Sequence, residues 1–132
     1  MIGLDTNVVV RYLTQDDSRQ APIATRFIEK SLSVNQPRFV SLIVLAEVVW
    51  VLVSLYNSDR RKVVEVVEAL LTAQQLQVED APSVWRAVRR YVATKIDFRD
   101  ALIVEAALAN GCAKTVTFDI ACKGVVGFEL LS

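Results

Sequence analysis

The stretch Met1-Ile2-Gly3-Leu4-Asp5-Thr6-Asn7-Val8 opens the chain with a short, mostly apolar run that leads directly into an acidic side chain. Such a run predicts a buried strand, and residues 8–13 then predict a short helix. Much later, residues 114–118 form another predicted strand with Asp119 directly after it. In open α/β sheets ligands bind at the carboxyl ends of the strands, so Asp5 and Asp119 stand where this rule expects a site.

Between these two points, apolar runs alternate with helical patterns, which is typical of an α/β domain with a mainly parallel sheet. Residues 18–33 predict a helix with apolar residues Ile23, Phe27, Ile28 and Leu32 in helical spacing, followed by a turn at 35–37 and a strand at 38–40. Ser41 can cap a helix that ends near Tyr56, and Asn57-Ser58-Asp59 can cap the amphipathic helix over 60–73. The remaining predicted elements are a strand at 76–78, a helix over 82–94, a helix containing 101–109 and ended by Gly111, a turn or short helix over 119–127, and a strand at 128–131. The 132 residues, 53% of them hydrophobic, match a single domain spanning 1–132 with a substantial core.

The chain contains no histidine. This absence excludes serine–histidine triads, metal-free ribonucleases that use histidine acids, and zinc sites that need imidazole. Metal chemistry with oxygen ligands remains open. The two cysteines, Cys112 and Cys122, are too few for a four-thiolate zinc site and lack CxxC spacing, so we expect reduced, buried thiols.

The net charge is zero, which argues against a non-specific nucleic-acid binder with a basic surplus. Local basic clusters occur at Arg60-Arg61-Lys62 and along Arg86, Arg89, Arg90 and Lys95, the second interleaved with Trp85 and Tyr91. Solvated helix faces explain both clusters about as well as phosphate binding does.

The longest apolar run, residues 48–55, is far shorter than the roughly 20 residues of a membrane span, and no signal-peptide pattern precedes Asp5. We therefore expect a soluble, cytoplasmic protein without a membrane segment. The helix that carries this run, with Trp50, is apolar on nearly every side. Such a helix lies in the core or shares a face with another surface, and core burial is the favoured interpretation.

Five acidic residues stand in otherwise apolar stretches: Asp5, Glu47, Asp97, Asp100 and Asp119. Carboxylates beside buried surface need a compensating partner, and one divalent cation such as Mg²⁺ or Mn²⁺ can compensate several of them. This pattern favours a metal-dependent phosphodiesterase.

Ordinary structural roles exist for most of these acids. Asp5 can cap the helix that follows it, and Asp119 can be a turn residue. Asp97 can cap the helix that contains residues 101–109, with Asp100 in the first turn of that helix. Glu47 has no obvious polar side of its helix, and a buried glutamate without a partner tends to protonate. Each of these roles could explain one acid, but five acids in apolar stretches of one chain favour a shared metal site.

Four motifs occur in a characteristic order: Leu4-Asp5-Thr6-Asn7-Val8, Leu45-Ala46-Glu47, Asp97-Phe98-Arg99-Asp100-Ala101-Leu102-Ile103 and Thr115-Val116-Thr117-Phe118-Asp119. The chain resembles a PIN-domain nuclease over essentially its whole length, and more narrowly it resembles the VapC-type toxins of prokaryotic toxin–antitoxin pairs. The resemblance implies a PIN-like three-layer sandwich, with a mainly parallel central sheet of about four to five strands flanked by helices.

The resemblance also implies site residues. Asp5, Glu47, Asp100 and Asp119 match the catalytic acids that line the Mg²⁺ or Mn²⁺ site, whereas Thr6, Asn7 and Thr117 match positions that hold carboxylates or water in a supporting role, and Asp97 is peripheral. One departure follows Asp119, where many relatives have a basic residue and an aromatic. This chain has Ile120-Ala121-Cys122-Lys123 instead.

The expected activity is a Mg²⁺- or Mn²⁺-dependent endoribonuclease that hydrolyses RNA phosphodiester bonds, the toxin of a VapBC-type pair. The resemblance further implies a homodimer and a cognate antitoxin whose extended tail covers the active site. Arg11, Arg99 and the arginines of residues 86–95 are candidate phosphate contacts.

Two alternatives remain open. One is a catalytically inactive PIN-like module that binds RNA or protein, although the intact set of acids argues against it. The other is an aspartyl-phosphate phosphatase with Asp5 as nucleophile, but Asn7 stands where that class usually has a second aspartate.

Overall fold

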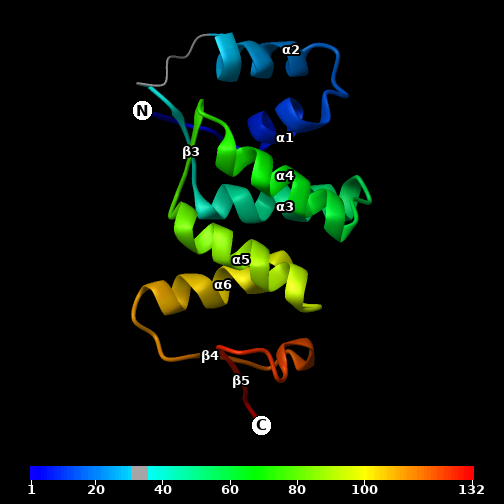
Figure 1. Cartoon of the computed structure of the whole chain (residues 1–132). Coiled ribbons are helices and arrows are strands. Elements are labelled where there is room, and N and C mark those ends of the chain that lie inside the picture. The colour runs from blue at the N-terminus through cyan, green and yellow to red at the C-terminus, as the bar shows by residue number, and fades with distance from the viewer. Residues whose placement is uncertain (31–35) are drawn as a thin grey trace. The chain divides into compact units, whose positions relative to one another are not determined.

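The computed structural model describes residues 1–30 and 36–132. The chain divides into two compact units, Met1–Ala81 and Pro82–Ser132. Figure 1 labels their helices and strands. The end of the predicted helix over 18–33, with Leu32, and the first residue of the predicted turn at 35–37 lie outside the described residues.

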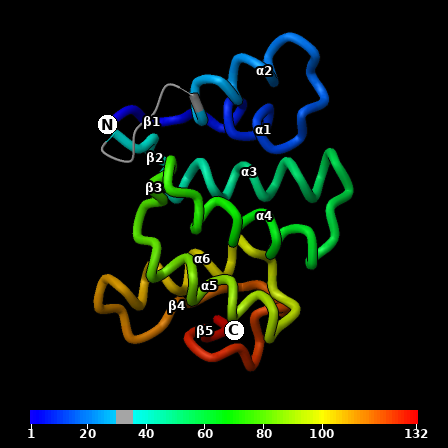
Figure 2. The backbone as a smooth tube through the Cα atoms, turned by 45° about the horizontal axis from the view of Figure 1, so that its top comes forward, coloured from blue at the N-terminus to red at the C-terminus, as the bar shows by residue number. Residues whose placement is uncertain are grey.

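The first unit contains a three-stranded parallel sheet in the order β1 (Ile2–Gly3), β2 (Arg38–Val40) and β3 (Leu76–Val78), and these strands lie side by side in Figure 2. All three strands were predicted. β1 is an edge strand, and the prediction that it is buried was wrong for Ile2, which is 51% exposed. Only Leu4, directly after the strand, is buried; its N–H donates to the Phe39 carbonyl at 2.9 Å.

The helices of the first unit are α1 (Thr6–Thr14), α2 (Gln20–Thr25), the π-helical turn η1 (Arg26–Lys30), α3 (Leu42–Leu55) and α4 (Arg60–Thr72). The expected caps are present: the Ser41 hydroxyl accepts from the Val44 N–H at 3.1 Å, and the Asp59 carboxylate accepts from the Lys62 N–H at 2.8 Å. α4 buries Val63, Val66, Val67 and Leu70, as its periodicity predicts.

The segment predicted as one helix from residue 18 is α2 followed by η1. Of the apolar residues of this segment, Ile28 is buried whereas Ile23 and Phe27 are exposed. Ile23 and Phe27 instead line an open groove against α1.

Helix α3 has one buried and one exposed face. Leu45, Val48, Val49 and Leu52 are buried, whereas Ile43, Trp50 and Val53 are 74%, 59% and 44% exposed. The expectation that this helix lies wholly in the core was therefore wrong for its Trp50 side. Glu47 is also exposed, so the expectation of a buried Glu47 was wrong as well.

The second unit begins at Pro82, in the first turn of α5 (Ala81–Ala93), and continues with α6 (Phe98–Ala109), β4 (Thr115–Thr117), the 3₁₀ turn η2 (Ile120–Cys122) and β5 (Phe128–Leu130). β4 and β5 pair in parallel. The Tyr91 and Phe98 rings pack edge to face with centroids 5.6 Å apart. α6 ends before Gly111, which has a φ of +88°, as the sequence predicts.

Gly127 sits where the chain turns back into β5. Its φ is +96°, and a Cβ at this position would lie 2.8 Å from Val104 Cγ2 of α6. Only glycine therefore lets the loop approach α6 this closely.

The fold class is α/β with parallel strands, as expected, and residues 1–30 and 36–132 contain six α-helices. In the described residues the five strands are hydrogen-bonded as a three-stranded and a two-stranded sheet. A search of residues 1–30 and 36–132 finds no helix with the length and apolar character that a membrane crossing requires.

Candidate metal centre

Asp100 lies in the first turn of α6 and is half-buried. Burial of the carboxylate, followed by the negative charges of Asp97 and Asp119, raises its pKa above the ordinary value, and the Arg99 guanidinium opposes this rise only in part. An ionised Asp100 is therefore in a position where a cation would stabilise it.

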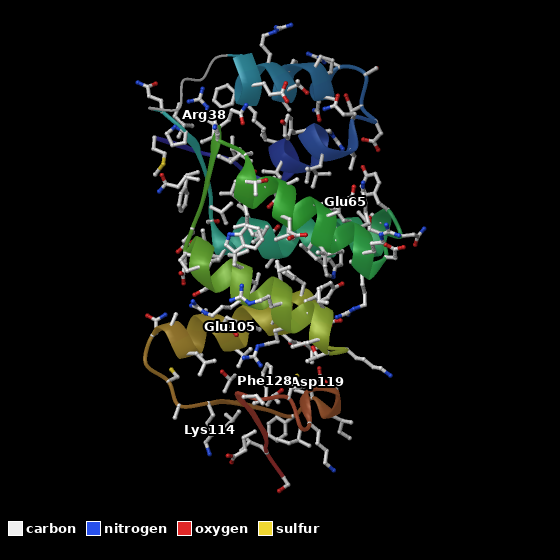
Figure 3. The ribbon with its side chains drawn as sticks, viewed as in Figure 1. Arg38, Glu65, Glu105, Lys114, Asp119 and Phe128 are labelled. Atoms are coloured by element: carbon white, nitrogen blue, oxygen red, sulfur yellow. The ribbon has the colours of Figure 1, made fainter. Side chains whose placement is uncertain are left out.

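Asp119 follows β4 and caps η2. One carboxylate oxygen accepts from the Ala121 N–H at 2.9 Å, and the Asp119 N–H donates to the Thr117 hydroxyl at 3.0 Å. The turn prediction for Asp119 is thus confirmed, and Thr117 contacts the backbone of Asp119. Figure 3 labels Asp119 at this turn.

Three side chains of the second unit converge. One ligand atom each from Asp100, Asp119 and Cys122 lies within 4.8 Å of the others. Cys122 is buried, as expected, and burial together with the nearby carboxylates raises the pKa of its thiol. Cys112 is exposed, so the prediction that both thiols are buried was wrong for Cys112.

Asp97 occupies the N-cap position of α6, as the sequence predicts, but its side chain accepts no hydrogen bond from the helix backbone. The capping role assigned to its carboxylate was therefore wrong. What Asp97 does contribute is negative charge, which acts on both Asp100 and Cys122.

Asp5 lies in the first unit, at the carboxyl end of β1, and is exposed. Its carboxylate accepts from the Thr6 N–H at 2.7 Å, which confirms its capping role in α1. The Thr6 hydroxyl is buried and has no hydrogen-bond partner among the described residues. Asp5 and Asn7 line a groove of about 590 Å³ whose walls are mostly apolar side chains of β1, α1 and α2.

Glu47 extends from the exposed face of α3 in the same unit. The structure thus brings together Asp100 and Asp119 within the second unit, and it describes Asp5 and Glu47 within the first.

The basic side chains of α5 differ in their partners. Arg86 and Arg90 form ion pairs with the buried Glu105 of α6, at 3.2 and 2.9 Å, and Arg90 also donates to the Val126 carbonyl. Figure 3 labels Glu105 on α6. Arg89 is exposed, so it is the arginine of this cluster best placed to meet a phosphate. In the first unit, Arg11 Nε donates a hydrogen bond to Gln20 Oε1 at 2.8 Å.

Comparison with known proteins agrees with the motifs. The family model for the PIN domain matches residues 2–125 of the chain. The chain belongs to the PIN domain family. This PIN domain is also 29% identical over 115 residues to a VapC ribonuclease of Aquifex aeolicus (strain VF5), an alignment that covers 87% of this chain and 84% of the relative. The resemblance drawn from the sequence is thereby confirmed.

PIN nucleases generally use divalent metal ions, and the acidic cluster of this PIN domain suits one. Asp100 and Asp119 offer the hard oxygen donors that Mg²⁺ and Mn²⁺ prefer.

Cys122 is the member of the cluster that sequence reasoning missed as a possible ligand. A signal was available, because residues three apart lie on the same side of a 3₁₀ turn and Cys122 follows Asp119 by three positions. The number of cysteines and the absence of CxxC spacing predict only a buried thiol and do not reveal this proximity to Asp119.

Proposed function

We propose that this PIN domain, residues 1–132 acting as a single domain, is a VapC-type endoribonuclease that depends on Mg²⁺ or Mn²⁺ and is the toxin of a toxin–antitoxin pair. The observation that carries the proposal is the convergence of Asp100 and Asp119 in a chain similar to a VapC ribonuclease. Two carboxylates this close repel each other unless a cation lies between them or one takes up a proton.

The proposed metal ligands and catalytic acids are Asp5, Glu47, Asp100 and Asp119. A bound cation would supply Lewis-acid stabilisation of the phosphate and lower the pKa of an attacking water. The hydrogen bonds from Ala121 N–H to Asp119 and from Thr6 N–H to Asp5 fix one oxygen of each carboxylate, which leaves the other oriented for binding.

Thr6, Asn7, Thr117 and Asp97 are proposed as supporting residues. The contact between the Thr117 hydroxyl and the Asp119 backbone supports a positioning role for Thr117. Asp97 supports cation binding through its negative charge beside Asp100. Hydrolysis by water would leave a 5′-phosphate and a 3′-hydroxyl on the RNA.

The proposed partners are RNA, a second copy of the chain and a cognate antitoxin, all in the cytoplasm. The exposed apolar side chains of α3, namely Ile43, Trp50 and Val53, support self-association, because monomers rarely expose such a row. The mostly apolar groove beside Asp5 supports an antitoxin segment that ends near the acids.

The deciding experiment incubates antitoxin-free protein with total bacterial RNA in Mn²⁺ or in EDTA and maps the cleaved ends. Asp5→Asn is tested beside it, with Glu68→Gln on the exposed side of α4 as the matched control. We expect discrete cuts bearing 5′-phosphates in Mn²⁺, absent in EDTA and in Asp5→Asn, and retained in Glu68→Gln.

The same experiment distinguishes the proposed nuclease from the alternative, an inactive PIN-like module that binds RNA or protein without cutting RNA. Binding of Mn²⁺ and RNA without any cleavage would favour that module. Cleavage that persists in EDTA would contradict metal dependence.

A further inference from the structure

Cys122 places a thiol in a cluster that otherwise consists of hard oxygen donors. Its side chain is 1% exposed, and among the described residues its sulfur has no hydrogen-bond partner. The sulfur lies within 4.8 Å of a carboxylate oxygen of Asp100 and of Asp119. A buried sulfur thus lies beside two carboxylates to which the proposed function assigns a cation.

The chemistry of these three donors is not that of a magnesium site alone. Magnesium and calcium take oxygen ligands, whereas thiolate selects softer cations such as Zn²⁺ and binds Co²⁺ as well. Two carboxylates and one thiolate carry three negative charges, and such a set leaves a fourth position open for water or substrate.

We propose that Cys122 supplies a thiolate ligand to the cation held by Asp100 and Asp119, so that this centre binds thiophilic divalent cations such as Zn²⁺ and Co²⁺ in addition to the Mg²⁺ or Mn²⁺ of the proposed nuclease. The inference rests on the proposed function only in assigning a cation to these two carboxylates. On binding, the thiol proton passes to solvent, a sulfur–metal bond forms, and the ion loses a water molecule.

The distances fit this assignment. With zinc–sulfur and zinc–oxygen bonds of about 2.3 and 2.1 Å, tetrahedral donors stand about 3.6 Å apart. The three donor atoms lie within 4.8 Å of one another, so a shift of about 1 Å brings them to the spacing of a tetrahedral zinc site. η2 is a single turn between Asp119 and Lys123, and we expect this turn to accommodate such a shift.

The test uses the full chain and Co²⁺ alone. A cysteine ligand gives a sulfur-to-cobalt charge-transfer band in the near ultraviolet, which carboxylate ligands do not produce. We expect the band in the unaltered protein, its loss in Cys122→Ser and Cys122→Ala, and its retention in Cys112→Ser. Cys112 is the matched control because it is the exposed thiol and lies outside the cluster.

Competition dialysis gives a second readout. Removal of even an outer contact to a ligand weakens metal binding by about 10- to 100-fold, so loss of Cys122 should weaken Zn²⁺ binding at least tenfold. Mg²⁺ binding should change little. Circular dichroism of both Cys122 variants checks that the helices remain, and Asp119→Asn, which keeps the thiol, should weaken Zn²⁺ binding independently.

Absence of the charge-transfer band in the unaltered protein would overturn the inference, as would a band that survives in Cys122→Ser and disappears in Cys112→Ser. Failure of the proposed function is distinguishable from both results. RNA cleavage in Mn²⁺ without a cobalt–sulfur band would contradict the thiolate ligand but support the proposed nuclease. A cobalt–sulfur band without RNA cleavage would support the thiolate ligand but contradict the proposed nuclease.

Discussion

Opposing electrostatic effects act on the pKa of Asp100 in the metal-free protein. Partial burial and the charges of Asp97 and Asp119 raise its pKa, while Arg99 lowers it to a smaller extent. A folded-state pKa above the unfolded value means that protonated Asp100 favours folding. This contribution is fully present below the ordinary carboxyl pKa and is lost as the pH rises through the raised folded pKa. Ionised Asp100 therefore destabilises the metal-free fold at neutral pH.

Replacing Asp100 with asparagine should remove this destabilisation. In EDTA at pH 7 we expect Asp100→Asn to melt at a higher temperature than the unaltered protein, with the difference shrinking as the pH falls toward 4. Thermal melts followed by circular dichroism at the two pH values measure this. A variant that melts lower than the unaltered protein at pH 7 would contradict the electrostatic account.

The same variant should respond weakly to metal. A ligand at 100 times its Kd stabilises the folded state by about 2.7 kcal/mol, and Mn²⁺ should raise the melting temperature of the unaltered protein accordingly. In Asp100→Asn the rise should fall to less than half, whereas Glu68→Gln should keep it. An undiminished rise would remove Asp100 from the ligand set.

At this scale the sequence predicted the local structure around two of the acids better than it predicted side-chain exposure. Asp5 and Asp119 were located because they follow strands, and the short-range hydrogen bonds that cap α1 and η2 depend only on neighbouring residues. The exposure of Glu47 and of Cys112 depends on which face of a helix or loop meets the core. That choice is made by residues distant in sequence, so local pattern did not reveal it.

At the scale of elements, Arg90 joins three parts of the second unit. From α5 its guanidinium donates to Glu105 of α6 at 2.9 Å and to the Val126 carbonyl of the loop that follows Asp119. Its side chain is 14% exposed and that of Glu105 is 7% exposed, so this pair is shielded from water. The helix that carries Asp100 and the loop after Asp119 are therefore held by one side chain.

Truncation of Arg90 should be costly because it leaves a buried carboxylate with only the more exposed Arg86. We expect Arg90→Ala to lower the free energy of unfolding by about 3 kcal/mol, as removal of one partner from a buried pair usually does. Arg89→Ala, on the exposed side of the same helix, should change it by less than about 0.5 kcal/mol. Urea denaturation measures both, and equal losses in the two variants would refute the special role of Arg90.

Most elements were predicted from the sequence to within a few residues, because strong caps and breakers mark their ends. Ser41, Asp59 and Gly111 are examples. The burial of α3 was not predicted correctly, since nearly every residue of this helix is apolar and no periodic contrast distinguishes its faces. The division of the five strands into two hydrogen-bonded sheets likewise has no local signal.

At the scale of the whole molecule, the PIN family model spans residues 2–125 and thus covers both compact units. If the chain acts as a single domain, as we propose, calorimetry should show one transition with equal calorimetric and van't Hoff enthalpies. Two resolved transitions would mean that the units unfold independently.

Self-association should depend on the exposed face of α3. A charge at Trp50, which is 59% exposed, would be buried without a partner in an apolar interface. We therefore expect Trp50→Glu to sediment as a monomer with an unchanged helical spectrum, whereas the unaltered chain and Glu68→Lys sediment as dimers. A monomeric unaltered chain at micromolar concentration would contradict the proposed dimer.

The two cysteines of this molecule differ sharply in access, one exposed just after α6 and the other enclosed beside the acids. A maleimide dye added to the native protein should therefore attach at Cys112 and spare Cys122. The chain thus carries a natural attachment point for a fluorescent dye, which allows the proposed binding of RNA or of a protein partner to be tested without introducing any mutation.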